Sequence, residues 1–181
     1  MIKGLSKRIL TKWMGFKINV TIPHPEKYII ALAPHTSNWD FIIGILYSRA
    51  MGFKCDFMMK KSWFFWPLGY IMKGLGGIPV ERNKKMSLTD QLAKVAKSRK
   101  TFHLCITPEG TRKRVTEWKK GFYYIALKAE IPILLYAIDY KKKLIECTKM
   151  ITPNGNFDEQ IAEIKEYFRY TIGKIPKNFA I

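Results

Sequence analysis

The sequence is short of the residues that mark several large classes of protein. Its 181 residues include only three cysteines, Cys55, Cys105 and Cys147, which lie far apart in apolar stretches. An odd number of widely spaced cysteines, without metal-ligand spacing, argues against a disulfide framework and against a cysteine metal site. We therefore expect three buried thiols in a reducing compartment, and no bound metal.

The chain also lacks a hydrophobic run that would cross a membrane. A spanning helix needs about 20 consecutive apolar residues, and the best candidates, residues 41–47 and 63–72, are too short. The N-terminus is basic but has no continuous apolar stretch, so it is not typical of a secretory signal. If the protein meets a membrane, we expect it to do so from the surface.

Acidic residues are scarce. The chain has 14 Asp and Glu against 32 Lys and Arg, a net charge of +18. A charge of this size predicts attraction to nucleic acid, anionic lipid or an acidic carrier protein, and does not choose among them. A nucleic-acid-binding module is disfavoured, because no binding motif is recognisable and the aromatic residues cluster instead of being spread through basic strands.

Residues 1–16 have the pattern of a basic amphipathic helix. Apolar residues at helical spacing alternate with cations: Ile2, Leu5, Ile9, Trp13 and Phe16 with Lys3, Lys7, Arg8 and Lys12. Such a helix can lie in the headgroup region of a membrane, where each cation near anionic lipid contributes about 1 kcal/mol. The alternative is a helix that covers the domain with its apolar stripe, and one helix can do both.

Strand and helix patterns alternate along the rest of the chain, without repeats or long linkers, so we expect a single domain over residues 1–181. Strands are predicted at residues 18–22, 28–33, 54–59, 77–80, 102–107 and 131–139, with a further edge strand at 144–147. Helices are predicted at residues 37–51, from 87 onward, at 119–130 and at 158–172. This order predicts an α/β fold with a mainly parallel central sheet flanked by helices. In such folds, sites lie in the loops at the carboxyl ends of strands.

A histidine and an aspartate follow the predicted strand 28–33. His35 lies directly after it, and Asp40 lies in the first turn of the next helix. Helical side chains lean toward the helix N-terminus, so Asp40 can reach back to the imidazole of His35. A histidine held by a carboxylate has a fixed tautomer and a nitrogen that accepts a proton, as a general base requires. The alternative is an ordinary helix-start aspartate beside a structural histidine.

The loop after residues 102–107 has four residues suited to an anion site: Glu109, Gly110, Thr111 and Arg112. Glycine allows tight backbone geometry, threonine offers a hydroxyl, and arginine suits a phosphate. The glutamate could orient either of the last two. A plain structural turn remains the alternative.

Arg82, after the predicted short strand 77–80, is a second candidate phosphate ligand. The glycines at 74, 76 and 77 superficially resemble a dinucleotide-binding loop. They precede the strand instead of following one and opening a helix, which excludes that interpretation.

Four short blocks in a fixed order carry a family resemblance. They are the His-x-Ser-x-x-Asp block at 35–40, the segment 77–82, Glu-Gly-Thr-Arg at 109–112 and Ile-Pro-Ile at 131–133. Together they resemble the glycerolipid acyltransferases, the family of 1-acylglycerol-3-phosphate acyltransferases. The resemblance implies transfer of a fatty acyl group from acyl-CoA or acyl carrier protein to a lipid hydroxyl, in phospholipid biosynthesis at the cytoplasmic face of a membrane.

The resemblance also implies roles for individual residues. His35 would take the proton from the acceptor hydroxyl as it attacks the thioester carbonyl, and Asp40 would orient His35. Neighbouring backbone N–H groups would stabilise the oxyanion. Arg82, Gly110 and Arg112 would hold the acceptor phosphate in a site shaped by Glu109. The reaction needs no acyl-enzyme and no cofactor, because the acyl thioester is a co-substrate.

The nature of the acceptor stays open at this point. A lysophosphatidate-type lipid is the leading hypothesis, and another lysophospholipid or a lyso-aminolipid is the alternative. A lipid-binding protein without catalysis is a third possibility. The aromatic run 63–66, which follows Lys60 and Lys61, suits a membrane interface or the wall of an acyl tunnel, with ordinary core packing as the alternative.

Overall fold

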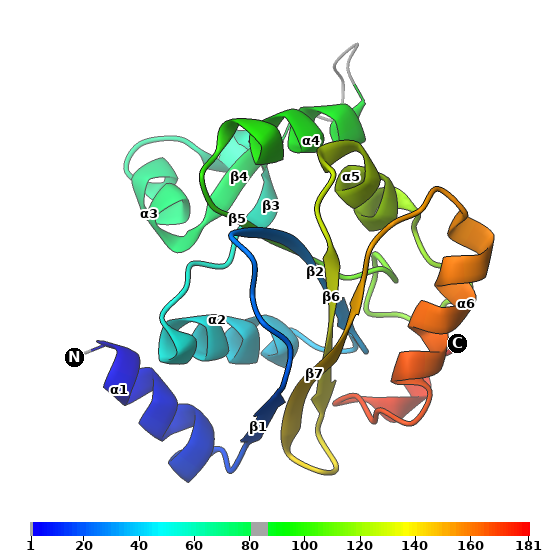
Figure 1. The fold of residues 1–181 in the computed structure, drawn as a ribbon. Helices are drawn as coiled ribbons and strands as arrows, with labels where there is room; N and C mark the ends of the chain where they lie inside the picture. The colour runs from blue at the N-terminus through cyan, green and yellow to red at the C-terminus, as the bar shows by residue number, and fades with distance from the viewer. Residues whose placement is uncertain (1, 81–86) are drawn as a thin grey trace.

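The computed structural model describes residues 2–80 and 87–181, and its core is a mixed sheet covered by helices on both faces (Figure 1). Among these residues, five strands form the main sheet in the order β1-β7-β6-β2-β5. Their bounds are Lys17–Val20 (β1), Lys27–Ala33 (β2), Phe102–Ile106 (β5), Ile133–Asp139 (β6) and Leu144–Ile151 (β7). β2 pairs in parallel with both β5 and β6, β1 pairs in parallel with β7, and the β6–β7 pair is antiparallel. The predicted α/β fold with a mainly parallel sheet is confirmed.

The central strand β2 explains why helices lie on both faces of the sheet. Ile29 and Ala31 pack into one hydrophobic cluster, whereas Tyr28 and Ile30 pack into the other. Side chains of successive strand residues point to opposite faces. A strand that is apolar at every position must therefore be buried on both faces, as parallel strands usually are.

Two sets of helices cover the two faces of the sheet. The first face is packed by α4 (Leu88–Ser98), α5 (Gly121–Ala129) and α6 (Phe157–Phe168). The opposite face is packed by α2 (Trp39–Met51) and by the N-terminal helix, which consists of α1 (Ile2–Arg8) and the continuing turn η1 (Ile9–Trp13). No helix in the described ranges 2–80 and 87–181 is long and apolar enough to span a membrane.

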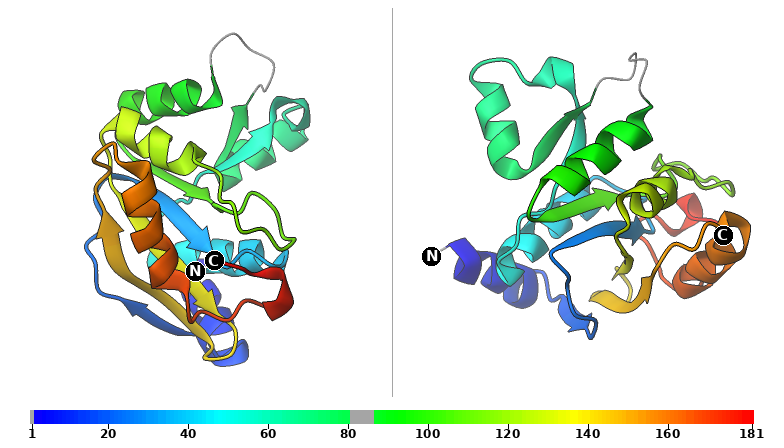
Figure 2. Two further views of the ribbon diagram at one scale, coloured as in Figure 1. Left: turned by 90° about the vertical axis from the view of Figure 1, so that its right-hand side faces the viewer. Right: turned by 45° about the horizontal axis from the view of Figure 1, so that its top comes forward.

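A small unit stands beside the main sheet, next to α4 (Figure 2). It consists of the parallel strands β3 (Phe57–Lys60) and β4 (Gly77–Val80), joined by η2 (Lys61–Trp63) and α3 (Leu68–Leu75). A bridge between Asp56 and Leu104 connects it to β5. Gly76 lies at a φ of 107°, and a Cβ there would collide with the carbonyl oxygen of Cys55. Only glycine therefore allows this close approach of the two backbones.

The structure corrects two predicted details. The strand predicted as an edge at 144–147 is longer and lies inside the sheet, because β1 adds to its outer side. The predicted last helix ends at Phe168 instead of residue 172. Both corrections concern segments whose partners are distant in sequence, which local hydrophobic patterns do not reveal.

Candidate active site

The two loops that the sequence singles out meet at one edge of the sheet. β2 and β5 are parallel neighbours in register, with Ala31 opposite Ile106. The chain therefore leaves both strands at the same height, and the segment beginning at Pro34 lies against the segment beginning at Thr107. Parallel strands place their following loops together in this way.

His35 and Asp40 are in direct contact. The imidazole Nδ1 of His35 lies 3.1 Å from Oδ2 of Asp40. A carboxylate only accepts hydrogen bonds, so Nδ1 is the nitrogen that carries the hydrogen, and Nε2 keeps a lone pair. The imidazole is partly exposed, with 20% of its side chain accessible, whereas the carboxylate is fully buried. This is the geometry of a general base with an orienting partner.

The carboxylate of Asp40 is held by the backbone as well. Its Oδ2 accepts hydrogen bonds from the N–H groups of Thr36 and Ser37, each at 2.9 Å. The hydroxyl of Ser37 accepts from the N–H of Trp39 at 3.2 Å, so this serine caps the start of α2. The backbone between β2 and α2 therefore wraps around one carboxylate oxygen and fixes its position relative to the imidazole.

Glu109 is bound to the same loop. Its side chain is 4% exposed, and its Oε1 accepts a hydrogen bond from the N–H of His35 at 2.8 Å. Burial raises the pKa of Glu109, and the hydrogen bond from His35 offsets this only in part. The glutamate thus holds the backbone of the histidine from the neighbouring strand end.

These contacts bear on the expectation that backbone N–H groups next to His35 stabilise the oxyanion. The N–H groups of His35, Thr36 and Ser37 all donate to buried carboxylates, to Glu109 in the first case and to Asp40 in the other two. They point inward and do not offer an oxyanion site. Asn38 is the next residue along, and it lines the cavity beside the histidine.

The remaining members of the predicted phosphate site are separated. Gly110 has a φ of 64° and lines the cavity that also contains His35. The hydroxyl of Thr111 accepts from the N–H of Lys113 at 3.2 Å, which is a local turn contact. Arg112 is exposed and does not line the cavity. Arg82 lies outside the described residues.

A cavity of about 610 Å³ opens beside His35. Its walls come from β2, α2, β3, β5 and α5. Most of the lining side chains are apolar, among them Leu32, Phe41, Phe57, Met58, Ile106 and Phe122. Polar side chains converge at the histidine, among them Asn38, Thr107 and Lys119. An apolar hollow of this size with a few convergent polar groups is typical of a small-molecule site, for which about 300–1,000 Å³ is usual.

Two residues of this site escaped the sequence analysis. Lys119 lines the cavity next to Gly110, where a Cβ would lie 3.0 Å from the lysine Cγ. Tyr140, directly after β6, donates a hydrogen bond from its hydroxyl to Oδ1 of Asp40 at 2.6 Å. Lys119 lies beside Gly110 of the Glu-Gly-Thr-Arg block in space, although it follows that block by several residues in the sequence. Nothing local in the sequence marks Tyr140.

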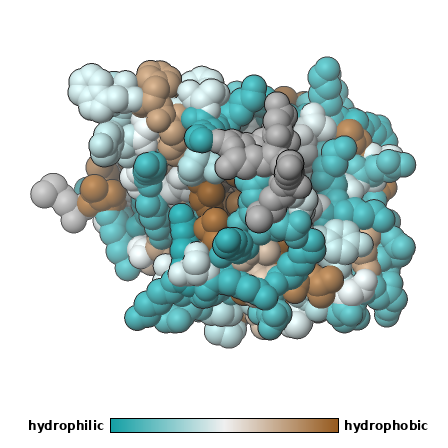
Figure 3. Space-filling view, turned by 90° about the horizontal axis from the view of Figure 1, so that it is seen from above, coloured by the Kyte–Doolittle hydropathy of each residue, from teal (hydrophilic) through white to brown (hydrophobic). Residues whose placement is uncertain are grey.

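The segments with predicted membrane contact are exposed. On the N-terminal helix, Leu10 is fully buried, whereas Ile2, Leu5 and Trp13 are 68%, 56% and 76% exposed. In the aromatic segment, large side chains also project outward: Trp63, Phe65, Trp66, Tyr70 and Ile71. Ordinary core packing of this run is therefore wrong. Seen from above, apolar and aromatic side chains gather at the left of the molecule, over α3 and beside the N-terminus (Figure 3).

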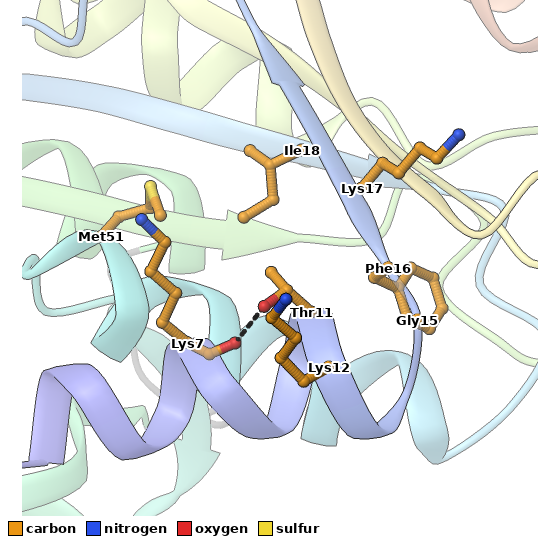
Figure 4. A pocket seen from close by; sticks show the side chains of 8 residues that line it. All are labelled: Lys7, Thr11, Lys12, Gly15, Phe16, Lys17, Ile18 and Met51. Carbon is orange, nitrogen blue, oxygen red and sulfur yellow. Dashed lines mark hydrogen bonds between the residues drawn. The ribbon is translucent and has the colours of Figure 1, made fainter.

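A second hollow of about 600 Å³ lies between η1, β1 and the end of α2 (Figure 4). Lys7 and Lys12 border it, and Phe16, Ile18 and Met51 form its apolar part. It shares no lining residue with the cavity at His35. It is therefore a feature of the N-terminal helix and not part of the candidate active site.

Comparison with known proteins points to one family. A model of the family described as Acyltransferase matches residues 17–139. No curated protein sequence matches the chain significantly. Among solved structures, the crystal structure of the 1-acyl-sn-glycerophosphate (LPA) acyltransferase PlsC from Thermotoga maritima has a similar fold, with a TM-score of 0.63 and 19% identity. The alignment covers 92% of this chain and 74% of that one.

Proposed function

Because the chain belongs to the Acyltransferase family, as its four sequence blocks predict, we propose that it acylates a lysophosphatidate-type lipid at a membrane surface. The acyl group comes from a thioester of CoA or acyl carrier protein and goes to the free hydroxyl of the lipid. The observation that carries this proposal is the buried Asp40 carboxylate on Nδ1 of His35, at 3.1 Å, beside an apolar cavity of about 610 Å³.

His35 acts as the general base. Its Nε2 takes the proton of the acceptor hydroxyl as the oxygen attacks the thioester carbonyl. Asp40 stabilises the imidazolium that forms. The tetrahedral intermediate then collapses: the carbon–sulfur bond breaks, and His35 returns its proton to the departing thiolate. Asn38 lines the cavity, and we assign its side-chain amide as the donor to the oxyanion.

The thiols that border the cavity bear on whether the acyl group is transferred directly or through an acyl-enzyme. Cys55 and Cys105 both line it. Contact with the Cys105 thiol, together with burial, raises the pKa of Cys55 well above its ordinary value. A thiol that does not ionise is a poor nucleophile, so Cys55 is unsuited to forming an acyl-enzyme. The apolar walls suit the fatty acyl chain instead.

The acceptor phosphate is assigned to the cations at the polar end of the cavity. Lys119 and the backbone of Gly110 line it there. Arg112, two residues further along the same loop, is exposed and has no ion pair among the described residues. A phosphate bound by Lys119 would attract the guanidinium of Arg112, which lies on the same loop as Gly110. We keep Arg82 as a further candidate for this site.

The membrane contact is assigned to the exposed apolar surface of the N-terminal helix and to the aromatic segment at α3. Leu10 fixes the helix to the domain, so the exposed Ile2, Leu5 and Trp13 are available to the lipid. Lys7 and Lys12, which border the hollow in Figure 4, lie between them in sequence and suit anionic headgroups. The helix therefore combines both alternatives from its sequence pattern: it covers the domain and presents an apolar stripe.

An acceptor screen tests the catalytic proposal. Purified protein is given a labelled acyl thioester, on CoA and on acyl carrier protein, with lysophosphatidate, other lysophospholipids or a lyso-aminolipid. We expect acylated product from lysophosphatidate, and a loss of about 10²–10⁴-fold or more in His35→Ala, as for a positioned general base. Activity that survives in His35→Ala would contradict the mechanism. Lipid binding without product from any acceptor would indicate a non-catalytic protein.

Vesicle sedimentation tests the membrane contact. Leu5 and Trp13 are replaced together by serine, which removes exposed apolar surface and leaves the buried Leu10 in place. We expect weaker binding to vesicles that contain anionic lipid. As a matched control, the exposed Tyr170 at the end of α6 is replaced by serine, with no expected effect. Unchanged sedimentation of the double variant would exclude the N-terminal helix as the membrane contact.

A further inference from the structure

We propose that Tyr140 is a positioning residue for acyl transfer, because its hydroxyl fixes the carboxylate of Asp40 that orients His35. The inference rests on the proposed function in one respect only, which is that His35 is the base. It concerns a residue outside all four sequence blocks, one hundred positions after Asp40 in the chain.

The two oxygens of the Asp40 carboxylate have different partners. Oδ2 accepts from Nδ1 of His35 and from the N–H groups of Thr36 and Ser37, all within five residues of the aspartate. Oδ1 accepts from the hydroxyl of Tyr140 at 2.6 Å. Among the described residues, Tyr140 is thus the donor to Asp40 that follows another strand of the sheet, β6. With Oδ2 held by the loop, this second hydrogen bond at Oδ1 prevents the carboxylate from rotating about its Cβ–Cγ bond.

Tyr140 is itself held from three sides. Its backbone N–H donates to the carbonyl of Ile172 at 2.8 Å. Its ring makes an edge contact with Phe16 at 5.8 Å between centroids, and Nζ of Lys174 lies 5.6 Å from the ring centroid. Burial, followed by the hydrogen bond to Asp40, raises the pKa of Tyr140. The phenol therefore stays protonated and remains a donor over the working pH range.

The hydroxyl also affects the charge of the pair. A donor on Oδ1 stabilises the negative charge of the fully buried carboxylate, and this charge stabilises the imidazolium that forms during the reaction. Without it, Asp40 would have a fully buried oxygen with no partner. The other charged groups near the imidazole are Glu109, through the backbone of His35, and Lys119, in the same cavity. Neither is altered by a change at Tyr140.

The test is Tyr140→Phe, with Tyr167→Phe as the matched control. The hydroxyl of Tyr167 accepts from the backbone and side chain of Thr148, at 3.1 and 3.3 Å, and Tyr167 does not line the cavity. For Tyr140→Phe we expect kcat to fall about tenfold, since hydrogen bonds to charged groups are worth more than neutral ones. We expect KM for both substrates to stay within about twofold. The control should change none of these.

A second measurement is independent of the substrate. The chain has three histidines, so the ring signals of His35 in NMR spectra can be assigned with a His35→Ala variant. In Tyr140→Phe, the chemical shifts of these signals at one fixed pH should change, because the partner of the imidazole is no longer held, and in Tyr167→Phe they should not. If wild type acylates no lipid but the His35 signals change in Tyr140→Phe, the proposed function fails, while the hold of Tyr140 on the Asp40–His35 pair is supported. Unchanged His35 signals, or an unchanged kcat with a lower melting temperature alone, would overturn the proposal.

Discussion

The sharpest prediction concerns Asp40→Asn, which removes one charge and keeps nearly every contact. Three N–H donors converge on Oδ2 of the carboxylate, from His35, Thr36 and Ser37. The amide oxygen of asparagine will take that position, and its NH₂ group will then face the hydroxyl of Tyr140, which can rotate to accept. No buried group loses its partner. The imidazole therefore keeps its tautomer, and the fold should lose less than about 1 kcal/mol, or roughly 2–4 °C in Tm.

The loss in catalysis should be much larger. Nδ1 of His35 lies 3.1 Å from the carboxylate oxygen. At this separation, with an effective dielectric constant of about 20, a full negative charge stabilises an imidazolium by about 5 kcal/mol. The asparagine oxygen retains part of this as a neutral hydrogen bond. We therefore expect kcat to fall about 10³-fold, which corresponds to about 4 kcal/mol.

The measurement is the release of thiol from an acyl thioester in the presence of lysophosphatidate, together with thermal unfolding of each variant. Asp139→Asn is the matched control. Asp139 is also buried and accepts from two backbone N–H groups, those of Lys142 at 2.8 Å and Ile172 at 3.4 Å, without touching His35. If Asp40→Asn keeps kcat within tenfold of wild type, or loses no more than the control, the charge of Asp40 does not support the reaction and our mechanism is wrong.

Other predictions concern the loop after β5. Glu109→Gln keeps an acceptor for the N–H of His35 and removes a buried charge. Burial raises the pKa of Glu109, so the folded protein binds this proton more tightly than the unfolded chain, and wild type loses stability as the pH rises above the ordinary value of 4.5. The variant should therefore unfold at higher temperature than wild type at neutral pH. Melting temperatures are measured across pH, and an equal dependence of Tm on pH in both proteins would contradict this. Glu109→Ala removes the acceptor and should cost about 1–3 kcal/mol of unfolding free energy. Arg112→Ala and Lys119→Ala should each raise KM for a phosphorylated acceptor more than KM for the acyl donor, and equal effects on both would show that the phosphate lies elsewhere.

The sequence predicted the fold class and the contact between His35 and Asp40 for physical reasons that operate locally. A strand that is apolar at every position must be buried on both faces, and a side chain in the first turn of a helix leans back toward the preceding loop. The sequence assigned Glu109 to a phosphate site, whereas the hydrogen bond that it accepts from the His35 N–H depends on the register of β2 with β5. That register is set by packing across the sheet.

What the sequence could not predict depends on contacts between distant segments. Thr36, inside the first block, accepts a hydrogen bond from the N–H of Ile175 near the C-terminus. Gly173 lies so close that a Cβ would be 2.8 Å from the Thr36 hydroxyl. No spacing or periodicity relates residues that are more than one hundred positions apart. The same holds for Tyr140, whose use in the site follows from the position of β6 beside β2.

The order of strands in the sheet connects these observations. β6, β2 and β5 are adjacent and mutually parallel through β2, so their carboxyl ends meet at one edge. Each of these strands is followed within a few residues by one residue of the site: Tyr140 after β6, His35 after β2 and Glu109 after β5. Asp40 receives hydrogen bonds from the first two, and Glu109 holds the backbone of the second. The base is therefore positioned by the ends of three strands as well as by its own loop, so substitutions that loosen the pairing of β2 should reduce kcat before they unfold the protein.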